Sequence, residues 1–135
     1  RGQLDWRLRN DPRVVCMEGT NARHLQGLPE PIALVVGDLS FISLRLVLPA
    51  IAAISPTGEA VVLVKPQFEA GRAAVRKGVV RGEAREASID EVCAAITAAG
   101  HRLIGRMDCP IPGARAGNVE ALVHFRLQCG SEGSP

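Results

Sequence analysis

The sequence predicts an α/β fold whose sheet is mostly parallel and ends in an antiparallel pair of strands. Two uninterrupted aliphatic runs, residues 32–36 and 61–64, have the pattern of strands that are buried on both faces. Residues 43–54, between them, have helical apolar spacing. A strand, a helix and a second strand in this order require a parallel pair. Residues 119–127 instead alternate apolar and polar side chains, which indicates an antiparallel or edge strand.

The segments before the first aliphatic run predict two further elements. Leu4 and Leu8 are four residues apart, so residues 3–10 should form a short amphipathic helix, with Trp6 packing it on the sheet. The apolar run 14–17 has the composition of a short strand.

Inside the predicted βαβ unit, Pro49 should kink the helix or break it early. A longer helix is predicted from about residue 84 to 99, because its large apolar residues share one face and Gly100 supplies a C-terminal stop. Residues 101–107 should form a strand.

Length and composition indicate one domain. The chain has 135 residues, 47% hydrophobic and 22% charged, which is typical of a packed globular domain. We expect one partial domain over residues 1–128 and a disordered tail over 129–135. The net charge of +2 does not indicate a nucleic-acid binder, although 14 of the 16 cations are Arg, the better bidentate ligand for phosphate.

The sequence also argues against a membrane protein and against a metal-binding protein. No apolar stretch approaches the roughly 20 residues that a bilayer span needs, so we expect no membrane segment and a cytoplasmic location. The four cysteines are scattered without metal-ligand spacing, so we expect no metal site.

Polar side chains at the carboxyl ends of the two aliphatic strands are the first candidates for chemistry. Asp38 follows one strand and Lys65 the next, where α/β sheets bind their ligands. Neighbouring strands lie about 5 Å apart, so both side chains should reach one edge of the sheet. Pro66 favours an extended Lys65. The alternatives are that Asp38 caps the next helix, that Lys65 is a solvated strand end, and that Glu120 is an exposed surface carboxylate.

Three strings of residues carry a family resemblance. They are Asp-Leu-Ser-Phe-Ile-Ser at 38–43, Leu-Val-Lys-Pro-Gln-Phe-Glu at 63–69 and Gly-Asn-Val-Glu at 117–120. In order and spacing they resemble the TlyA, or hemolysin A-like, family of FtsJ-type methyltransferases. Residues 9–14 and 20–23 are also similar to that family, so that the resemblance extends over residues 1 to about 128.

The resemblance implies a Rossmann-like methyltransferase sheet that transfers a methyl group from S-adenosylmethionine to a ribose 2′-hydroxyl of ribosomal RNA. The partner would be ribosomal RNA or a ribosomal subunit. Family members use a Lys-Asp-Lys-Glu tetrad, and Asp38, Lys65 and Glu120 match its last three positions. The first lysine, the glycine-rich cofactor loop and the first strands would lie before Arg1. We therefore expect the isolated chain to be inactive, to expose apolar surface and to be prone to self-association.

The resemblance also suggests ligand contacts. Thr20 and Asn21 would hold the adenine ring, with a simple turn as the alternative for this pair, and Asp38 and Leu39 would line the methionine side. RNA phosphates could meet a cluster of cations for which a solvated loop is the alternative: Arg72, Arg76, Lys77, Arg81 and Arg85.

A ribose hydroxyl is a poor nucleophile and must lose its proton during attack. Because carboxylates near Lys65 favour its charged form, we expect Lys65 to stabilise the incipient alkoxide electrostatically rather than to act as the base. Two other functions remain open at this point: a membrane-active hemolysin and a non-catalytic RNA-binding fragment.

Overall fold

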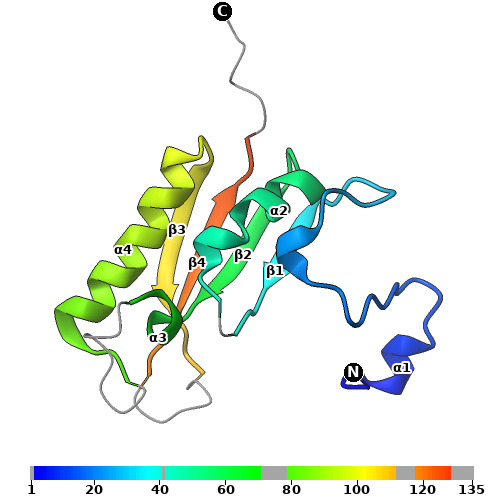
Figure 1. Ribbon diagram of the computed structural model, residues 1–135, viewed down its shortest axis with the longest axis horizontal. Helices are drawn as coiled ribbons and strands as arrows, with labels where there is room; N and C mark the ends of the chain where they lie inside the picture. The colour runs from blue at the N-terminus through cyan, green and yellow to red at the C-terminus, as the bar shows by residue number, and fades with distance from the viewer. Residues whose placement is uncertain (1, 41, 71–78, 112–117, 129–135) are drawn as a thin grey trace, which may run out of the picture.

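The computed structural model describes residues 2–40, 42–70, 79–111 and 118–128. Its centre is a four-stranded sheet with the order β1-β2-β4-β3 (Figure 1). The strands are β1 (Leu34–Gly37), β2 (Glu59–Val64), β3 (Arg102–Asp108) and β4 (Ala121–Arg126).

The strand directions confirm the central topological predictions. β1 and β2 are parallel, and β3 and β4 are antiparallel. The expectation of a mostly parallel sheet is wrong for the described strands, because β4 inserts between β2 and β3 and runs antiparallel to both. One of the three pairings is parallel, so the sheet is mixed. β4 is also an interior strand of the sheet rather than an edge strand.

Helices cover one face of this sheet (Figure 1). The segment between β1 and β2 forms a short 3₁₀ helix, η2 (Leu44–Leu46), and then α2 (Leu48–Ile54). Pro49 lies in the first turn of α2. The N–H groups of a first turn have no partner within the helix, so a proline, which lacks an N–H, costs no hydrogen bond there. The early break predicted within residues 43–54 lies between η2 and α2, before Leu48. The turn α3 (Pro66–Glu69) follows β2, and α4 (Gly82–Ala98) leads to β3.

The core lies between the inner face of the sheet and these helices. Val62 and Val64 of β2 alternate with partly exposed neighbours, as a period of two requires. The predicted apolar face of α4 is confirmed, since four large residues of that helix are buried: Ile89, Val92, Cys93 and Ile96. Gly100 has a φ of +92° just beyond the last helical turn, as a C-terminal stop favours.

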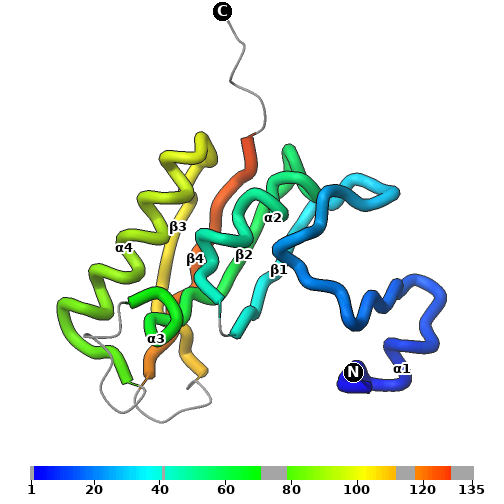
Figure 2. The backbone as a smooth tube through the Cα atoms, in the orientation of Figure 1, coloured from blue at the N-terminus to red at the C-terminus, as the bar shows by residue number. Residues whose placement is uncertain are grey.

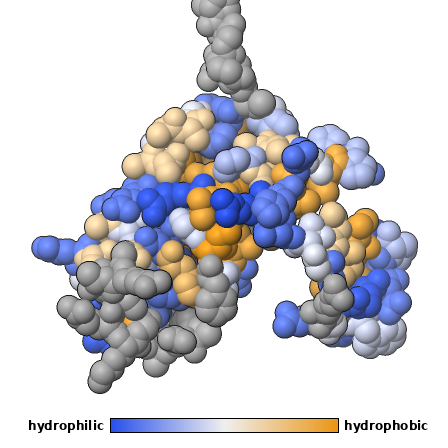
Figure 3. Space-filling view, in the orientation of Figure 1, coloured by the Kyte–Doolittle hydropathy of each residue, from blue (hydrophilic) through white to orange (hydrophobic). Residues whose placement is uncertain are grey.

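The N-terminal arm, residues 2–20, departs from two predictions. Residues 14–17 form no strand, and Val15 is 82% exposed. The short helix α1 (Trp6–Arg9) has no buried residue, and Trp6 is 71% exposed instead of packing on the sheet. Figure 2 shows the arm leading away from the sheet, and Figure 3 shows apolar surface on it. A short apolar run becomes a strand only where another strand offers its backbone, and no described strand lies beside this one.

The opposite face of the sheet is open and exposes several large apolar side chains, so β1 is not buried on both faces as its aliphatic run predicts. Leu34 and Val36 of β1 are 56% and 75% exposed, and Met107 of β3 is 58% exposed. Within the described residues, no helix is long and apolar enough to cross a membrane.

Candidate functional site

Asp38 and Lys65 meet at one edge of the sheet, as the strand pattern predicts. The parallel register aligns Gly37 with Val62, so that both strands end at the same edge. The Lys65 ammonium nitrogen lies 2.6 Å from Asp38 Oδ1. It also donates a hydrogen bond to the Ser40 hydroxyl at 3.3 Å. Lys65 thereby joins two residues of the loop that follows β1.

The environment of this pair is asymmetric. The Lys65 side chain is 12% exposed, whereas that of Asp38 is 68% exposed. Lys65 has extended backbone angles, φ −109° and ψ 102°, and α3 begins immediately after it at Pro66, as the Pro66 argument predicts. Its burial argues against a freely solvated strand end. Nor is Asp38 a helix cap, because Ser43 occupies the N-cap position of η2.

Glu120 reaches the same edge on the other side of β2. The antiparallel register pairs Val64 with Ala121, so Glu120 lies opposite Lys65 where the ladder ends. Glu120 is only 7% exposed, which excludes the exposed-carboxylate alternative. The predicted alternation fails here, since Val119 is 44% exposed and the strand begins only at Ala121. In the described residues the ion-pair partner of Lys65 is Asp38 rather than Glu120.

Three contacts fix the backbone around Glu120. The Val80 N–H donates to Asn118 Oδ1 at 3.2 Å, the Cys109 N–H to the Glu120 carbonyl at 2.7 Å, and Arg85 Nε to the Val119 carbonyl at 2.9 Å. The Arg85 guanidinium also lies 2.7 Å from Asp108 and is 12% exposed. Arg85 thus places its donors on groups within the fold, and its contact with RNA stays a prediction.

The remaining cations of the predicted RNA contact are only partly covered by the structure. Arg81 is exposed and directly precedes α4. Arg72, Arg76 and Lys77 lie outside the described residues.

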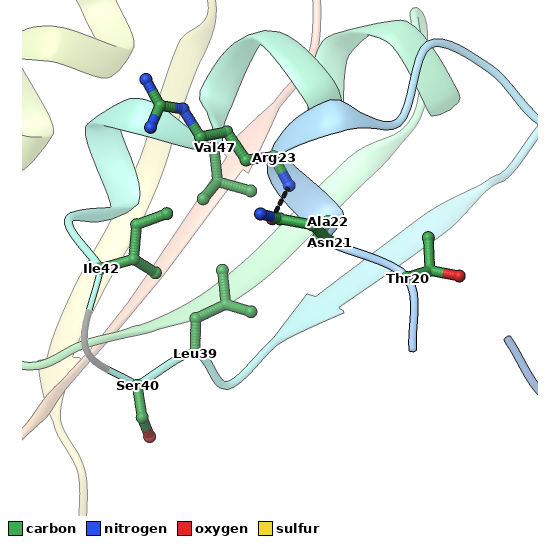
Figure 4. Close-up of a pocket in the computed structure, with 8 residues that line it drawn as sticks. All are labelled: Thr20, Asn21, Ala22, Arg23, Leu39, Ser40, Ile42 and Val47. Carbon is green, nitrogen blue, oxygen red and sulfur yellow. Dashed lines mark hydrogen bonds between the residues drawn. The ribbon is translucent and has the colours of Figure 1, made fainter. Parts of the chain in front are cut away.

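A hollow of about 340 Å³ opens beside the loop after β1. Thr20 and Asn21 line it together with Leu39 and Ser40. In Figure 4 the apolar side chains of Leu39 and Val47 enter this space, whereas the Ser40 hydroxyl points away from it.

Asn21 also closes a turn in this hollow, so the turn interpretation holds together with the lining role. Its Oδ1 accepts the Arg23 N–H at 3.0 Å, at the start of the 3₁₀ helix η1 (Ala22–His24). Asp38 lines a neighbouring, more apolar hollow of about 280 Å³, which Leu39 shares.

Sequence reasoning missed two polar residues of this edge. Ser40 accepts a hydrogen bond from Lys65, and Glu69 is a buried carboxylate bonded to the loop after β1. Both lie in the quoted strings of residues, but their partners are 25 and 26 positions away, beyond the reach of any local pattern. The described residues hold no group of three His, Cys, Asp or Glu side chains arranged for a metal ion.

The carboxyl ends of β1 and β2, together with the hollow beside them, can bind a ligand that has two features. One is an apolar ring, and the other is a group that becomes negatively charged. The hollow supplies apolar walls and amide and hydroxyl groups, while the largely buried Lys65 ammonium supplies a fixed positive charge. Ligands of open α/β sheets bind at this edge.

Comparisons with known proteins agree on one family. The model of the FtsJ-like methyltransferase family matches residues 1–127. The chain is 46% identical over 134 residues to the 16S/23S rRNA (cytidine-2′-O)-methyltransferase TlyA of Mycobacterium tuberculosis, covering 94% of this chain and 49% of that protein. It is 43% identical over 132 residues to YqxC of Bacillus subtilis, provisionally named an rRNA methyltransferase, covering 91% and 46%.

A solved structure shares the architecture. A protein of Streptococcus thermophilus, provisionally described as a hemolysin, superposes with a TM-score of 0.86 at 40% identity, covering 95% of this chain and 48% of that one. The chain spans about half the length of the curated relatives it matches.

Proposed function

The chain belongs to the FtsJ-like methyltransferase family, and we propose that it is part of an enzyme that methylates a ribose 2′-hydroxyl of ribosomal RNA. The observation that carries the proposal is the contact of Lys65 with Asp38 at the carboxyl edge of two parallel strands. The chain is homologous to the 16S/23S rRNA (cytidine-2′-O)-methyltransferase TlyA, whose substrate supports ribosomal RNA as the partner of this protein. Since such an enzyme works on ribosomes, we propose a cytoplasmic protein.

The cofactor of the proposed reaction is S-adenosylmethionine, which supplies an electrophilic methyl group on a positively charged sulfur. The side chains that line the hollow beside β1 fit the adenine end of S-adenosylmethionine. Leu39, Ile42 and Val47 offer apolar contact for a ring, and the Asn21 amide and Thr20 hydroxyl offer hydrogen bonds at its border. Asp38 and Leu39, at the mouth of the neighbouring hollow, would border the methionine side.

Lys65 is proposed to act on the attacking ribose oxygen. S-adenosylmethionine, when bound, would supply the methyl group and keep the electron pair of the broken carbon–sulfur bond on its sulfur, while the ribose oxygen would gain the methyl group and its hydroxyl proton would pass to solvent water. A fixed ammonium beside the oxygen favours the negative charge that develops there. Asp38 and Ser40 hold that ammonium in place, and Glu120 presents a second carboxylate on the opposite side of β2.

The test is methyl transfer by the full polypeptide that carries this chain. Labelled S-adenosylmethionine and purified ribosomal subunits are the substrates, and resistance of the product to alkaline cleavage identifies a 2′-O-methyl group. We expect Lys65→Met to lower kcat by about 10²-fold to 10³-fold, as the loss of one preorganised charge does in other enzymes. Arg102→Met is the matched control, because Arg102 begins β3 at the opposite end of the sheet.

Other outcomes would point to the two alternatives. Salt-dependent RNA binding without methyl transfer by the wild-type polypeptide would favour a non-catalytic RNA-binding role. Release of dye from liposomes would favour the membrane-active hemolysin. Full activity of Lys65→Met would remove Lys65 from the site.

A further inference from the structure

We propose that Glu69 is a positioning residue, which holds the loop after β1 against Lys65 and thereby aligns the catalytic edge. The effect on catalysis rests on the proposed function, whereas the effect on the geometry of the loop does not. Glu69 ends α3, four residues after Lys65, and it is 7% exposed. A carboxylate so far out of water is stable only with strong partners.

The partners of Glu69 come from the loop after β1. The Ser43 hydroxyl donates to Glu69 Oε2 at 2.5 Å, and the Leu44 backbone N–H donates to Oε1 at 2.6 Å. Both carboxylate oxygens are thus bound by adjacent residues of a segment 25 and 26 positions away. Hydrogen bonds to a charged acceptor are among the strongest in proteins.

Arg45 provides the compensating charge. Its Nε lies 3.7 Å from Glu69 Oε2, and its Nη2 donates to the Glu69 carbonyl at 3.4 Å. Arg45 also pairs with Glu91 of α4 at 3.6 Å, but Glu91 is 59% exposed. Glu69 is thus the buried partner of Arg45 and Glu91 the exposed one, so a substitution at Glu91 serves as the control for one at Glu69.

These contacts act on the catalytic edge through a short chain segment. Asp38, which pairs with Lys65, and Ser43, whose hydroxyl binds Glu69, are only five positions apart in the chain. Lys65 directly precedes α3, and Glu69 is the last residue of α3. The loop after β1 therefore contacts both ends of α3, through Ser40 at Lys65 and through Ser43 at Glu69. Without the Glu69 contacts, only those of Asp38 and Ser40 with Lys65 would hold the loop against this turn. A displacement of about 1 Å can cost on the order of 10²-fold in rate.

The experiment compares Glu69→Gln, Glu69→Ala and the control Glu91→Gln in two measurements. The first is NMR on the full polypeptide without substrate. It records the hydrogen exchange of the Leu44 amide and the change that Lys65→Met causes in the chemical shift of the Asp38 carboxyl carbon. In the Glu69 variants we expect faster hydrogen exchange of the Leu44 amide. We also expect Lys65→Met to change the Asp38 carboxyl carbon shift less than it does in the wild type. The control should resemble the wild type. Glu69→Gln keeps the size of the side chain, so it serves if Glu69→Ala does not fold.

The second measurement is steady-state methyl transfer by the full polypeptide. We expect kcat to fall about tenfold or more in Glu69→Gln while KM for the RNA stays within about twofold, since a positioning defect acts in the transition state. An unchanged Asp38 response and an unchanged kcat in Glu69→Gln would overturn the proposal. If the NMR changes appear but the wild-type polypeptide transfers no methyl group, the methyltransferase function fails and the role of Glu69 in ordering the loop stands.

Discussion

At the scale of single residues, hydrogen-bond and ion-pair partners distinguish Lys65 from Arg85, whose side chains are equally buried at 12% exposure. Lys65 and Glu120 are largely buried at one sheet edge, and Asp38 stands exposed beside them. Arg85, by contrast, spends its donors on the Val119 carbonyl and on Asp108. A buried arginine that binds a backbone carbonyl in this way stabilises the segment that it contacts.

His101 makes stability depend on pH. Burial lowers the pKa of His101 below its usual value of 6.5, because desolvation disfavours the imidazolium. In the native chain the ring packs 6.0 Å from Phe125 and its Nδ1 accepts the Gln128 N–H at 3.1 Å. The unfolded chain therefore binds more protons below about pH 6.5. Stability from this group is complete above that pH and is lost as the pH falls through the lowered native pKa.

We expect the free energy of unfolding, measured by urea titration, to fall between pH 7.5 and 5. His101→Gln should flatten this dependence, whereas His24→Gln, at an exposed residue, should leave it unchanged. Equal slopes in the two variants would contradict a buried neutral His101.

At the scale of elements, the turn between α2 and β2 is tightly packed. The Ser55 hydroxyl donates to the Ile32 carbonyl at 2.5 Å, and Ser55 is fully buried. Gly58 passes against both: a Cβ there would lie 2.2 Å from Ser55 Oγ and 2.7 Å from the Ile32 carbonyl oxygen. The Gly58 carbonyl also accepts the Leu127 N–H at 2.8 Å, so this turn anchors the end of β4 as well.

Gly58→Ala should therefore lower the free energy of unfolding by about 1–3 kcal/mol, the usual cost of overpacking. Thermal denaturation followed by circular dichroism measures it. Gly27→Ala is the control, because a Cβ at Gly27 meets nothing within 4 Å. A melting temperature equal to that of the control would show that the turn can relax.

At the scale of the whole molecule, one face of the sheet is covered and the other is open. α2 and α4 cover the inner face, while Leu34, Val36 and Met107 stay exposed on the outer one. Among the described strands β1 has a single neighbour, β2, so β1 is an edge strand of this sheet. An exposed apolar edge strand favours association with another chain.

We expect the isolated chain to self-associate in a concentration-dependent way, visible by sedimentation velocity. Val36→Lys should weaken this association by placing a charge on the exposed edge strand. Val15→Lys is the control, since Val15 is 82% exposed but lies in the N-terminal arm. A wild-type chain that stays monomeric at high concentration would contradict the expectation.

The sequence alone determined the features that depend on local pattern. Aliphatic runs of strand length predicted β1 and β2, and the helical spacing between them predicted a parallel pair. That pairing places Asp38 and Lys65 together, so their contact was foreseeable. The buried face of α4 and its stop at Gly100 follow from periodicity and glycine chemistry in the same way.

Only the tertiary structure decided features that depend on which distant surfaces meet. β4 inserts between β2 and β3, which buries Glu120 and exposes Val119 against the simple alternation. Residues 14–17 form no strand because no described strand offers them a partner. Glu69 is recognisable as a buried link only when Ser43 and Leu44 stand beside it. Periodicity describes one element at a time, whereas burial and hydrogen bonding across the sheet edge depend on elements far apart in the chain.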